Sequence, residues 1–233
     1  MKFSLIIPCY NEEKNIPFLL EFCKPIADYP GTEIILVNNG SSDGSQQVFE
    51  NLLPSYPGCR LLTLEYNKGY GGGILAGLNV AHGDVLGWTH ADLQTDPKDT
   101  LKGLALFEEF GLLNFIKGSR YGRPFSDVIF TIGMSAFETL ILLKPMWDIN
   151  AQPTMFSRQF FDLWVEPPTD FSIDLYAYYL AKRQKLKVRR FPVEFSARVH
   201  GVSSWNVNWA AKWKFIRRTV EFSFQFKRTL RAW

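Results

Sequence analysis

Short runs of mainly apolar residues alternate with longer amphipathic segments through the first half of the chain. The runs have the length of strands, and the segments between them have the length of helices. The predicted strands are residues 3–7, 33–37, 60–65, 85–89 and 114–117. The predicted helices are residues 12–28, 71–82 and 97–110, with a further one through Val48 and Leu52. Strands that are apolar on both faces and alternate with helices are typical of a parallel sheet covered on both sides, so the pattern predicts an α/β domain.

Polar residues follow every predicted strand. They are Pro8-Cys9-Tyr10-Asn11-Glu12, Asn38-Asn39-Gly40-Ser41, Asn67-Lys68-Gly69, His90-Ala91-Asp92-Leu93-Gln94 and Gly118-Ser119-Arg120-Tyr121. In open parallel sheets, ligands bind beyond the carboxyl ends of the strands. We therefore expect these five segments to open onto one ligand-binding edge.

Length, charge and cysteine content narrow the class of protein. The 233 residues suit one sizeable domain, and the net charge of +3 is too small to indicate nucleic acid. The three cysteines lack metal-ligand spacing and fit reduced thiols in a cytosolic protein. The first apolar run is too short for a signal peptide, and the nearest candidate for a spanning helix, 128–143, contains Glu138. We expect a cytoplasmic chain without a spanning helix, and a homo-oligomer stays possible.

Three potential metal ligands, His90, Asp92 and Gln94, alternate directly after the fourth predicted strand. If the chain stays extended there, all three side chains point to one side. An imidazole, a carboxylate and an amide oxygen are possible ligands for Mg²⁺ or Mn²⁺, and such a cation can neutralise a diphosphate leaving group. The alternative is a polar strand end followed by a helix N-cap at Thr95 or Asp96.

The glycine-rich segment 67–73 opens the predicted helix over 71–82 and includes Lys68 and Gly69. Glycines at such a place let backbone amides approach an anion, and a helix N-terminus favours negative charge. The segment is not a Walker loop, which requires Gly-Lys-Ser or Gly-Lys-Thr. The alternative is close packing of the helix on the sheet, because Gly77 continues the small face.

Two arginines and two aspartates are further candidates. Arg120 and Arg198, which begins a small polar segment through Ser204, suit phosphate because a guanidinium donates two parallel hydrogen bonds. The alternative for each is a solvated surface charge. Asp170 and Asp174 stand among apolar residues, where a raised pKa suits a general base. The alternative is a helix N-cap or first-turn acid, and it fits Asp170 better than Asp174.

The last segment, 205–233, combines an aromatic stripe with basic residues. Residues at helical spacing form the stripe: Trp205, Trp209, Trp213, Ile216 and Val220. Helices of this kind lie in the headgroup layer of anionic membranes, and a second basic cluster at 182–190 favours that interpretation. The alternative is a stripe that packs on the core. We divide the chain into a domain of residues 1–204 and an amphipathic helix of residues 205–233, and we expect peripheral membrane contact.

Taken in order, these motifs resemble those of family 2 glycosyltransferases of the GT-A fold, and within them the dolichol-phosphate mannose synthase-like group. The resemblance covers nearly the whole chain and implies a mixed, mostly parallel sheet flanked by helices. It assigns Asp92, Gln94 and His90 to a Mg²⁺ or Mn²⁺ ion. The positions assigned to the nucleotide-sugar are Pro8, Tyr10, Asn11, Glu12, Asn38, Asn39, Lys68, Gly69, His90, Ala91 and Ser203.

Several positions depart from the pattern of that family. Asn38 and Asn39 stand where two aspartates are usual, so contacts to base and ribose lose charge, although an amide can donate and accept. His90 replaces the first aspartate of the metal motif, which makes Asp92 the expected anchor. Ser204 takes the place of a common lysine, and residues 148–154 replace a Gly-Gly-Phe-type acceptor segment.

The resemblance implies an inverting transfer of one hexose-type sugar from a UDP- or GDP-sugar donor to polyprenyl phosphate at the cytoplasmic membrane face. Asp92 is expected to anchor the cation on the diphosphate, and Arg120 and Arg198 to stabilise charge on the phosphates. If the acceptor is a sugar hydroxyl, Asp174 is the candidate base.

Three other functions are alternatives to this one. The first is the same chemistry on a saccharide acceptor in capsule or lipopolysaccharide assembly. The second is a nucleotidyltransferase, which needs a glycine-rich loop bearing Lys or Arg directly after the first strand; residues 8–12 contain none. The third is a non-catalytic membrane-surface adaptor with a degenerate nucleotide site, which the substitutions at Asn39 and His90 keep open.

Overall fold

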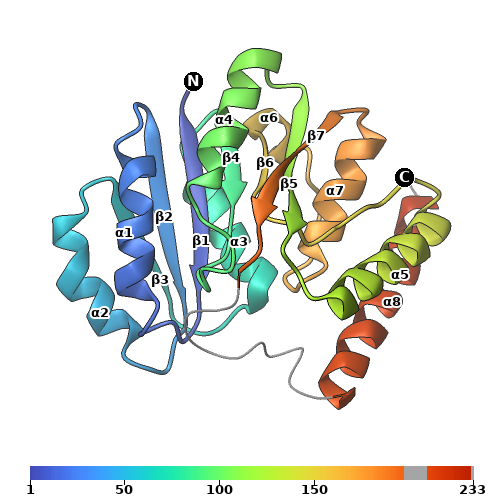
Figure 1. Cartoon of the computed structure of the whole chain (residues 1–233), viewed down its shortest axis with the longest axis horizontal. Helices are drawn as coiled ribbons and strands as arrows, with labels where there is room; N and C mark the ends of the chain where they lie inside the picture. The colour runs from blue at the N-terminus through green and yellow to red at the C-terminus, as the bar shows by residue number, and fades with distance from the viewer. Residues whose placement is uncertain (197–208, 232–233) are drawn as a thin grey trace.

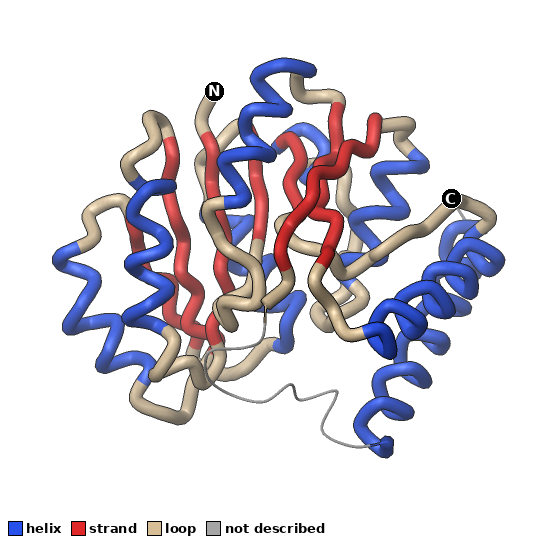
Figure 2. Tube along the Cα trace, in the orientation of Figure 1, coloured by secondary structure: helices blue, strands red, loops and turns tan. Residues whose placement is uncertain are grey.

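One mixed sheet organises the part of the chain that the computed structural model describes, residues 1–196 and 209–231. Its strands are β1 (Phe3–Cys9), β2 (Thr32–Asn39), β3 (Cys59–Leu64), β4 (Val85–Trp88), β5 (Asn114–Tyr121), β6 (Thr154–Ser157) and β7 (Lys187–Glu194). They pair in the order β3-β2-β1-β4-β6-β5-β7 (Figures 1 and 2). β6 runs antiparallel to β4 and β5, and the other neighbouring pairs are parallel.

Helices cover both faces of this sheet. They are α1 (Ile16–Ala27), α2 (Ser45–Leu52), α3 (Gly69–Val80), α4 (Asp99–Phe110), α5 (Phe125–Leu142), α6 (Arg158–Phe161), α7 (Ile173–Arg183) and α8 (Trp209–Arg231), with a 3₁₀ turn at Leu53–Ser55. Apolar side chains of α1, α2 and α4 share one core cluster with the sheet. Those of α3, α6, α7 and the ends of α5 and α8 share the other. Two apolar layers thus hold the sheet between helices, which confirms the predicted α/β fold.

The five predicted strands appear as β1 to β5, whereas the sequence pattern missed β6 and β7. β7, with the sequence KVRRFPVE, mixes charged and apolar residues and lies at the edge of the sheet, where charged side chains are common. Two residues of the basic cluster at 182–190 are engaged there: Arg189 donates to the Asn114 side chain at 2.9 Å and lies 3.4 Å from the Phe110 ring centroid. Arg190 donates to the Gly118 carbonyl at 2.7 Å. Part of that cluster therefore stabilises the sheet edge.

α8 packs against α5, at the lower right of Figure 1. Ser223 donates a hydrogen bond of 2.7 Å to buried Glu138, and the Phe224 ring lies against Phe137. The buried Phe226 ring joins the cluster of α7. The described part of the predicted amphipathic helix therefore contacts the domain, while the division at 204/205 lies outside the described residues and stays a prediction.

α5 is longer and more apolar than the sequence pattern suggested. Its 18 residues have the length and mean hydropathy of a membrane-spanning helix, and 17% of them are buried. We expected no spanning helix because of Glu138, yet α5 is long and apolar enough to span a membrane with that residue included. Core helices of soluble proteins can have the same length and hydropathy, so these two properties do not by themselves place α5 in a bilayer.

Candidate active site

The polar segments that follow the strands meet at one edge of the sheet, called the carboxyl edge below. β1, β2, β3, β4, β5 and β7 all end there, because these strands are mutually parallel. The edge lies at the bottom of Figure 1. All five segments predicted from the sequence lie along it, so the structure places the candidate residues on one side of the domain.

The β1 end is tied to the turn after β2. Asn11 has a positive φ of 56°, and its side-chain oxygen accepts a hydrogen bond of 2.8 Å from the Ser42 amide. The Glu12 amide donates to the Ser45 hydroxyl at 3.0 Å. Tyr10 is exposed beside this turn. The candidate nucleobase segment, which starts at Pro8, is thus a fixed loop with one exposed aromatic ring.

Asn39 is buried and binds the segment that leads into α3. Its side-chain oxygen accepts from the Lys68 amide at 3.0 Å, and its amide nitrogen donates to the Gly69 carbonyl at 2.9 Å. Asn38, also buried, donates to Gln46 at 2.7 Å. An aspartate accepts only, whereas an asparagine also donates. The departure from two aspartates therefore has a structural reason in this chain.

The glycines of α3 serve close packing. A Cβ atom on Gly77 would lie 2.5 Å from an Ile6 methyl group, and one on Gly69, whose φ is +79°, would lie 2.6 Å from the Thr169 carbonyl. Lys68 is exposed with its amine over the Tyr66 ring. These contacts support the packing interpretation of the glycine-rich segment, and anion binding by Lys68 and Gly69 stays a prediction.

The predicted metal ligands follow a bend rather than an extended strand. β4 ends at Trp88, and Leu93 has a positive φ of 56°, so the condition for three side chains on one side is not met. Asp92 is buried and accepts from the Gln94 amide at 3.2 Å. The Gln94 side chain donates to the Ser196 carbonyl beyond β7. Among the described residues, no three His, Cys, Asp or Glu side chains gather closely enough to hold a metal.

His90 lies against an aromatic stack. Its ring is 5.4 Å from the Tyr70 centroid, nearly parallel to it, and Tyr70 stacks on Phe171 at 4.6 Å. Ala91, the next residue, is buried. The imidazole and the Asp92 carboxylate remain a donor set that Mg²⁺ or Mn²⁺ accepts, which keeps a cation at the β4 end chemically reasonable.

Asp174 is buried at the first turn of α7, beside a lysine that the sequence analysis did not single out. Lys117 of β5 is fully buried, lies 3.9 Å from the Asp174 carboxylate and donates to the Thr154 hydroxyl at 2.6 Å. Burial lowers the pKa of Lys117 to about 7, although the nearby charge of Asp174 acts to raise it. Burial also raises the pKa of Asp174, and the charges of Lys117 and His90 counteract that rise.

Arg120 pairs with a second buried carboxylate. Its Nε donates to Asp148 at 3.0 Å, and Arg123 lies 3.9 Å from the same carboxylate. Burial alone would raise the pKa of Asp148, but the Arg120 charge and hydrogen bonds lower it below its ordinary value. The guanidinium of Arg120 also lies over the Phe195 ring. Arg120 is therefore fixed at the carboxyl edge, while Arg198 and Ser203 lie outside the described residues.

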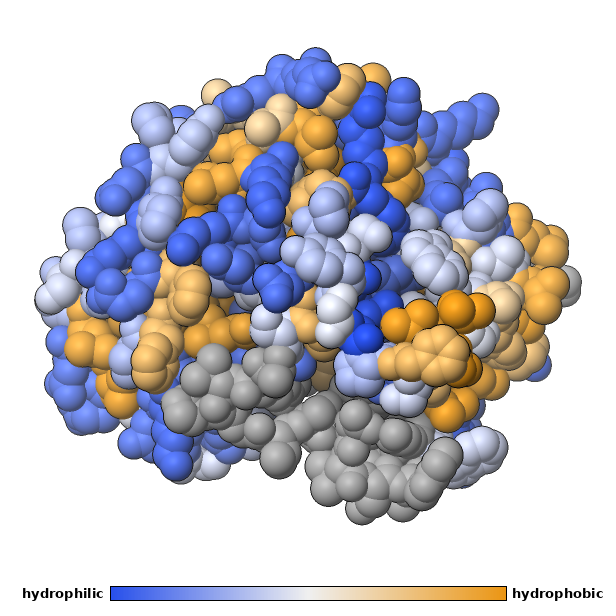
Figure 3. All heavy atoms as spheres, in the orientation of Figure 1, coloured by the Kyte–Doolittle hydropathy of each residue, from blue (hydrophilic) through white to orange (hydrophobic). Residues whose placement is uncertain are grey.

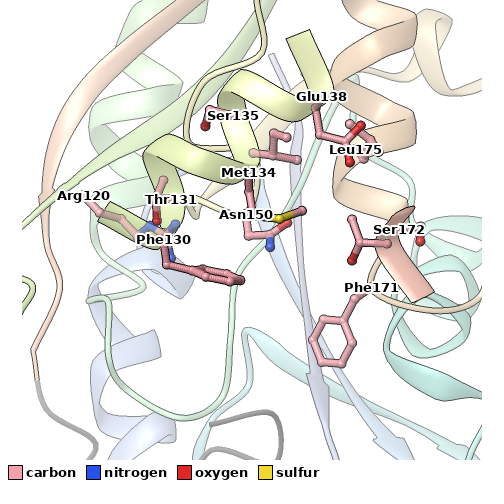
Figure 4. A pocket seen from close by; sticks show the side chains of 12 residues that line it. Arg120, Phe130, Thr131, Met134, Ser135, Glu138, Asn150, Phe171, Ser172 and Leu175 are labelled. Atoms are coloured by element: carbon pink, nitrogen blue, oxygen red, sulfur yellow. The ribbon is translucent and has the colours of Figure 1, made fainter. Parts of the chain in front are cut away.

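A pocket opens beside Arg120, between α5, α7 and α8 (Figure 4). Its cavity volume is about 60 Å³, and the hollow continues into open solvent. Figure 4 shows Phe130 and Met134 on α5 facing Leu175 of α7 and Ser172, the N-cap of that helix. Apolar and polar side chains alternate around the pocket with Arg120 at one end, which suits an amphiphilic ligand. No local sequence pattern indicates this pocket, because its walls come from separate segments of the chain.

Comparisons with known proteins agree with this arrangement. The model of the family "Glycosyl transferase family 2" matches residues 4–163. An undecaprenyl-phosphate 4-deoxy-4-formamido-L-arabinose transferase of Yersinia pestis is 32% identical over 131 residues, which are 53% of this chain and 39% of that protein. The transferase of that name from Proteus mirabilis is 37% identical over 115 residues, which are 46% of this chain and 34% of that protein.

Solved structures share the fold at low sequence identity. The glucosyl-3-phosphoglycerate synthase of Mycobacterium tuberculosis in complex with UDP superposes with a TM-score of 0.74 at 15% identity, over 97% of this chain and 80% of that one. The mannosyltransferase PcManGT of Pyrobaculum calidifontis, in complex with GDP-Man and Mn²⁺, gives 0.64 at 18% identity, over 86% and 58%. With the family model matching more than half of its length, the chain belongs to glycosyl transferase family 2 and has the GT-A fold.

Proposed function

We propose that this protein transfers a sugar from a UDP- or GDP-sugar to polyprenyl phosphate, with inversion at the anomeric carbon. The observation that carries the proposal is the carboxyl edge itself, where the Asp92 carboxylate at the β4 end and Arg120 at the β5 end lie on one side of the sheet. Relatives named as undecaprenyl-phosphate sugar transferases support this acceptor class. The chain spans 39% and 34% of those two relatives, so acceptor and donor are both part of the proposal.

The donor is proposed to bind along the ends of β1 to β4. Tyr10 and the loop that it belongs to border the base, and Asn39 holds the neighbouring turn in place. Asp92 would anchor a Mg²⁺ or Mn²⁺ ion with His90 beside it, and Gln94 braces the bend against Ser196. When bound, such a cation neutralises charge on the diphosphate leaving group.

The acceptor is proposed to occupy the pocket between α5, α7 and α8. The apolar side chains among its lining suit isoprene units. Arg120 at the carboxyl edge suits the phosphate, because a guanidinium retains donors beyond the two nitrogens that contact Asp148. A phosphate acceptor is already an anion and needs little help from a base. A buried, ion-paired Asp174 fits that acceptor better than it fits a saccharide hydroxyl.

The exposed face of α5 supports contact with the cytoplasmic face of a membrane. Apolar side chains recur along it with 46% to 79% exposure: Phe125, Ile129, Ile132, Leu140 and Leu143. Figure 3 shows hydrophobic side chains gathered over α5. On α8, Trp213 is exposed as well, beside the exposed Arg217. An apolar helix face next to aromatic and basic side chains suits the headgroup layer of an anionic bilayer.

The test is a panel of nucleotide-sugars with polyprenyl phosphate or a saccharide as acceptor, each with Mn²⁺, Mg²⁺ or chelator. We expect metal-dependent transfer to polyprenyl phosphate, and we expect Asp92→Asn to lower donor hydrolysis and transfer at least ~100-fold. Asp28→Asn, an exposed C-cap aspartate of α1, is the matched control and should retain wild-type rates. Wild-type rates for Asp92→Asn would remove the metal assignment, and transfer only to a saccharide would replace the acceptor.

A further inference from the structure

Lys117 places an amine inside the sheet, away from solvent. Its side chain has no exposed surface, and its amine donates to the Thr154 hydroxyl at 2.6 Å and lies 3.9 Å from the Asp174 carboxylate. A buried ammonium is stable only where hydrogen bonds and an opposite charge compensate for its lost hydration. Lys117 and Asp174 thus form a buried pair whose members depend on each other, directly beneath the carboxyl edge.

From Asp174 the contacts continue to Tyr70. The Gln152 side-chain amide donates to the Asp174 carboxylate at 2.9 Å and lies 3.2 Å from the Tyr70 hydroxyl. The hydroxyl end of Tyr70 is therefore linked to Asp174 through the buried Gln152 amide.

The ring of Tyr70 in turn determines where His90 lies. It stacks on His90, at 5.4 Å and 24°, and on Phe171, at 4.6 Å and 14°. A ring stacked on two neighbours and hydrogen-bonded at its hydroxyl has little freedom to move. The imidazole that stacks on it is thereby held at the β4 end, two positions before Asp92 in the chain.

We infer that Lys117, Asp174 and Tyr70 form a positioning chain that orients His90 at the carboxyl edge, and that Asp174 is a positioning residue rather than the general base. Asp174 is 1% exposed and its carboxylate is engaged by Lys117 and Gln152, so an acceptor hydroxyl has no approach to it. The inference rests on the proposed function only in taking the β4 end as the place where donor and cation bind. The orientation of His90 itself does not depend on that function.

The first experiment measures His90 in the absence of metal and donor. The Cε1–H resonance of His90, assigned with His90→Gln, carries a ring-current shift from stacked Tyr70. We expect Tyr70→Leu to move this resonance toward the value of an unstacked histidine. Asp174→Asn should move it in the same direction, and Tyr70→Phe, which keeps the ring, should move it less. The resonance of exposed His82 is the internal control and should not move.

The second experiment separates positioning from base catalysis. With Mn²⁺ and the donor identified by the panel, we expect Asp174→Asn to raise KM for the donor about 10-fold while kcat stays near wild type. A general base contributes ~10²–10⁴-fold to the rate, so loss of kcat on that scale with an unmoved His90 resonance would establish a base instead. Lys117→Met removes the cation that faces Asp174 and should move the His90 resonance in the same direction as Asp174→Asn does. If Lys117→Met does not fold, the double variant Lys117→Met/Asp174→Asn removes both charges, should fold, and should show the same movement.

The outcomes keep the two proposals apart. An unchanged His90 resonance in folded Asp174→Asn and Tyr70→Leu proteins would overturn the positioning chain even if the enzyme is active. A shifted resonance in a protein that binds no nucleotide-sugar would support the positioning chain and remove the proposed function.

Discussion

Glu138 gives the sharpest test of how α5 and α8 pack. The carboxyl has no exposed surface and accepts one hydrogen bond from Ser223. Within the described part of the chain, its second oxygen is buried without a hydrogen-bond partner. Burial raises the pKa of Glu138 from 4.5 to about 7, and the Ser223 hydrogen bond only partly opposes this. The charged form is thus poorly accommodated between the two helices, and Glu138→Gln removes it.

The magnitude follows from linkage between proton binding and folding. Between pH 4.5 and about 7 the folded chain binds more protons at Glu138 than the unfolded chain does, so stability falls as pH rises through this window. A difference of one pKa unit between the folded and unfolded chain corresponds to about 1.4 kcal/mol. Ionisation of Glu138 therefore destabilises the folded state by about 3 kcal/mol above pH 7. Glu138→Gln, which cannot ionise, avoids that cost and retains an acceptor for Ser223.

The assay is urea unfolding followed by tryptophan fluorescence at pH 5 and pH 8.5. We expect Glu138→Gln to have a stability close to wild type at pH 5 and to exceed it by about 2–3 kcal/mol at pH 8.5. Glu109→Gln, at an exposed position of α4, should differ from wild type by less than about 0.5 kcal/mol at either pH. An equal difference for Glu138→Gln at both pH values would refute a buried carboxyl between α5 and α8.

Two further changes test the carboxyl edge and the exposed face of α5. Asn39→Asp replaces the donor to the Gly69 carbonyl by a buried carboxylate. We expect this change to lower the free energy of unfolding by about 2–4 kcal/mol at pH 8 and by less at pH 4. Equal losses at the two pH values would contradict this reasoning. Ile129→Lys combined with Leu140→Lys should abolish co-flotation with anionic vesicles at unchanged thermal stability. Leu163→Lys, an exposed apolar position outside α5, is the control and should still float with the vesicles.

Local pattern was sufficient for much of the fold. The runs that form β1 to β5 are apolar enough to indicate buried strands. The segments between them are long enough to form helices. Because parallel strands end at a common edge, the sequence also indicated where Asp92 and Arg120 would lie. β7 was not predicted because charged residues interrupt its apolar ones. β6 was not predicted because its sequence, TMFS, has only two apolar residues between two hydroxyl-bearing ones, whereas the equally short β4 is VLGW.

The side-chain partners within the site were decided by the tertiary structure alone. Nothing near Lys117 in the chain indicates that it faces Asp174, and nothing near Asn39 indicates that it binds the segment before α3. The bend at Leu93, which turns Gln94 toward Ser196, likewise depends on β7. The spacing of apolar residues indicates which side of a helix or strand is buried, and the polar residues after the strands indicate where ligands bind. The identity of each polar contact depends on which distant strand or helix arrives beside it, because a buried charge or amide is stabilised only by the partners that the completed fold brings within hydrogen-bonding distance.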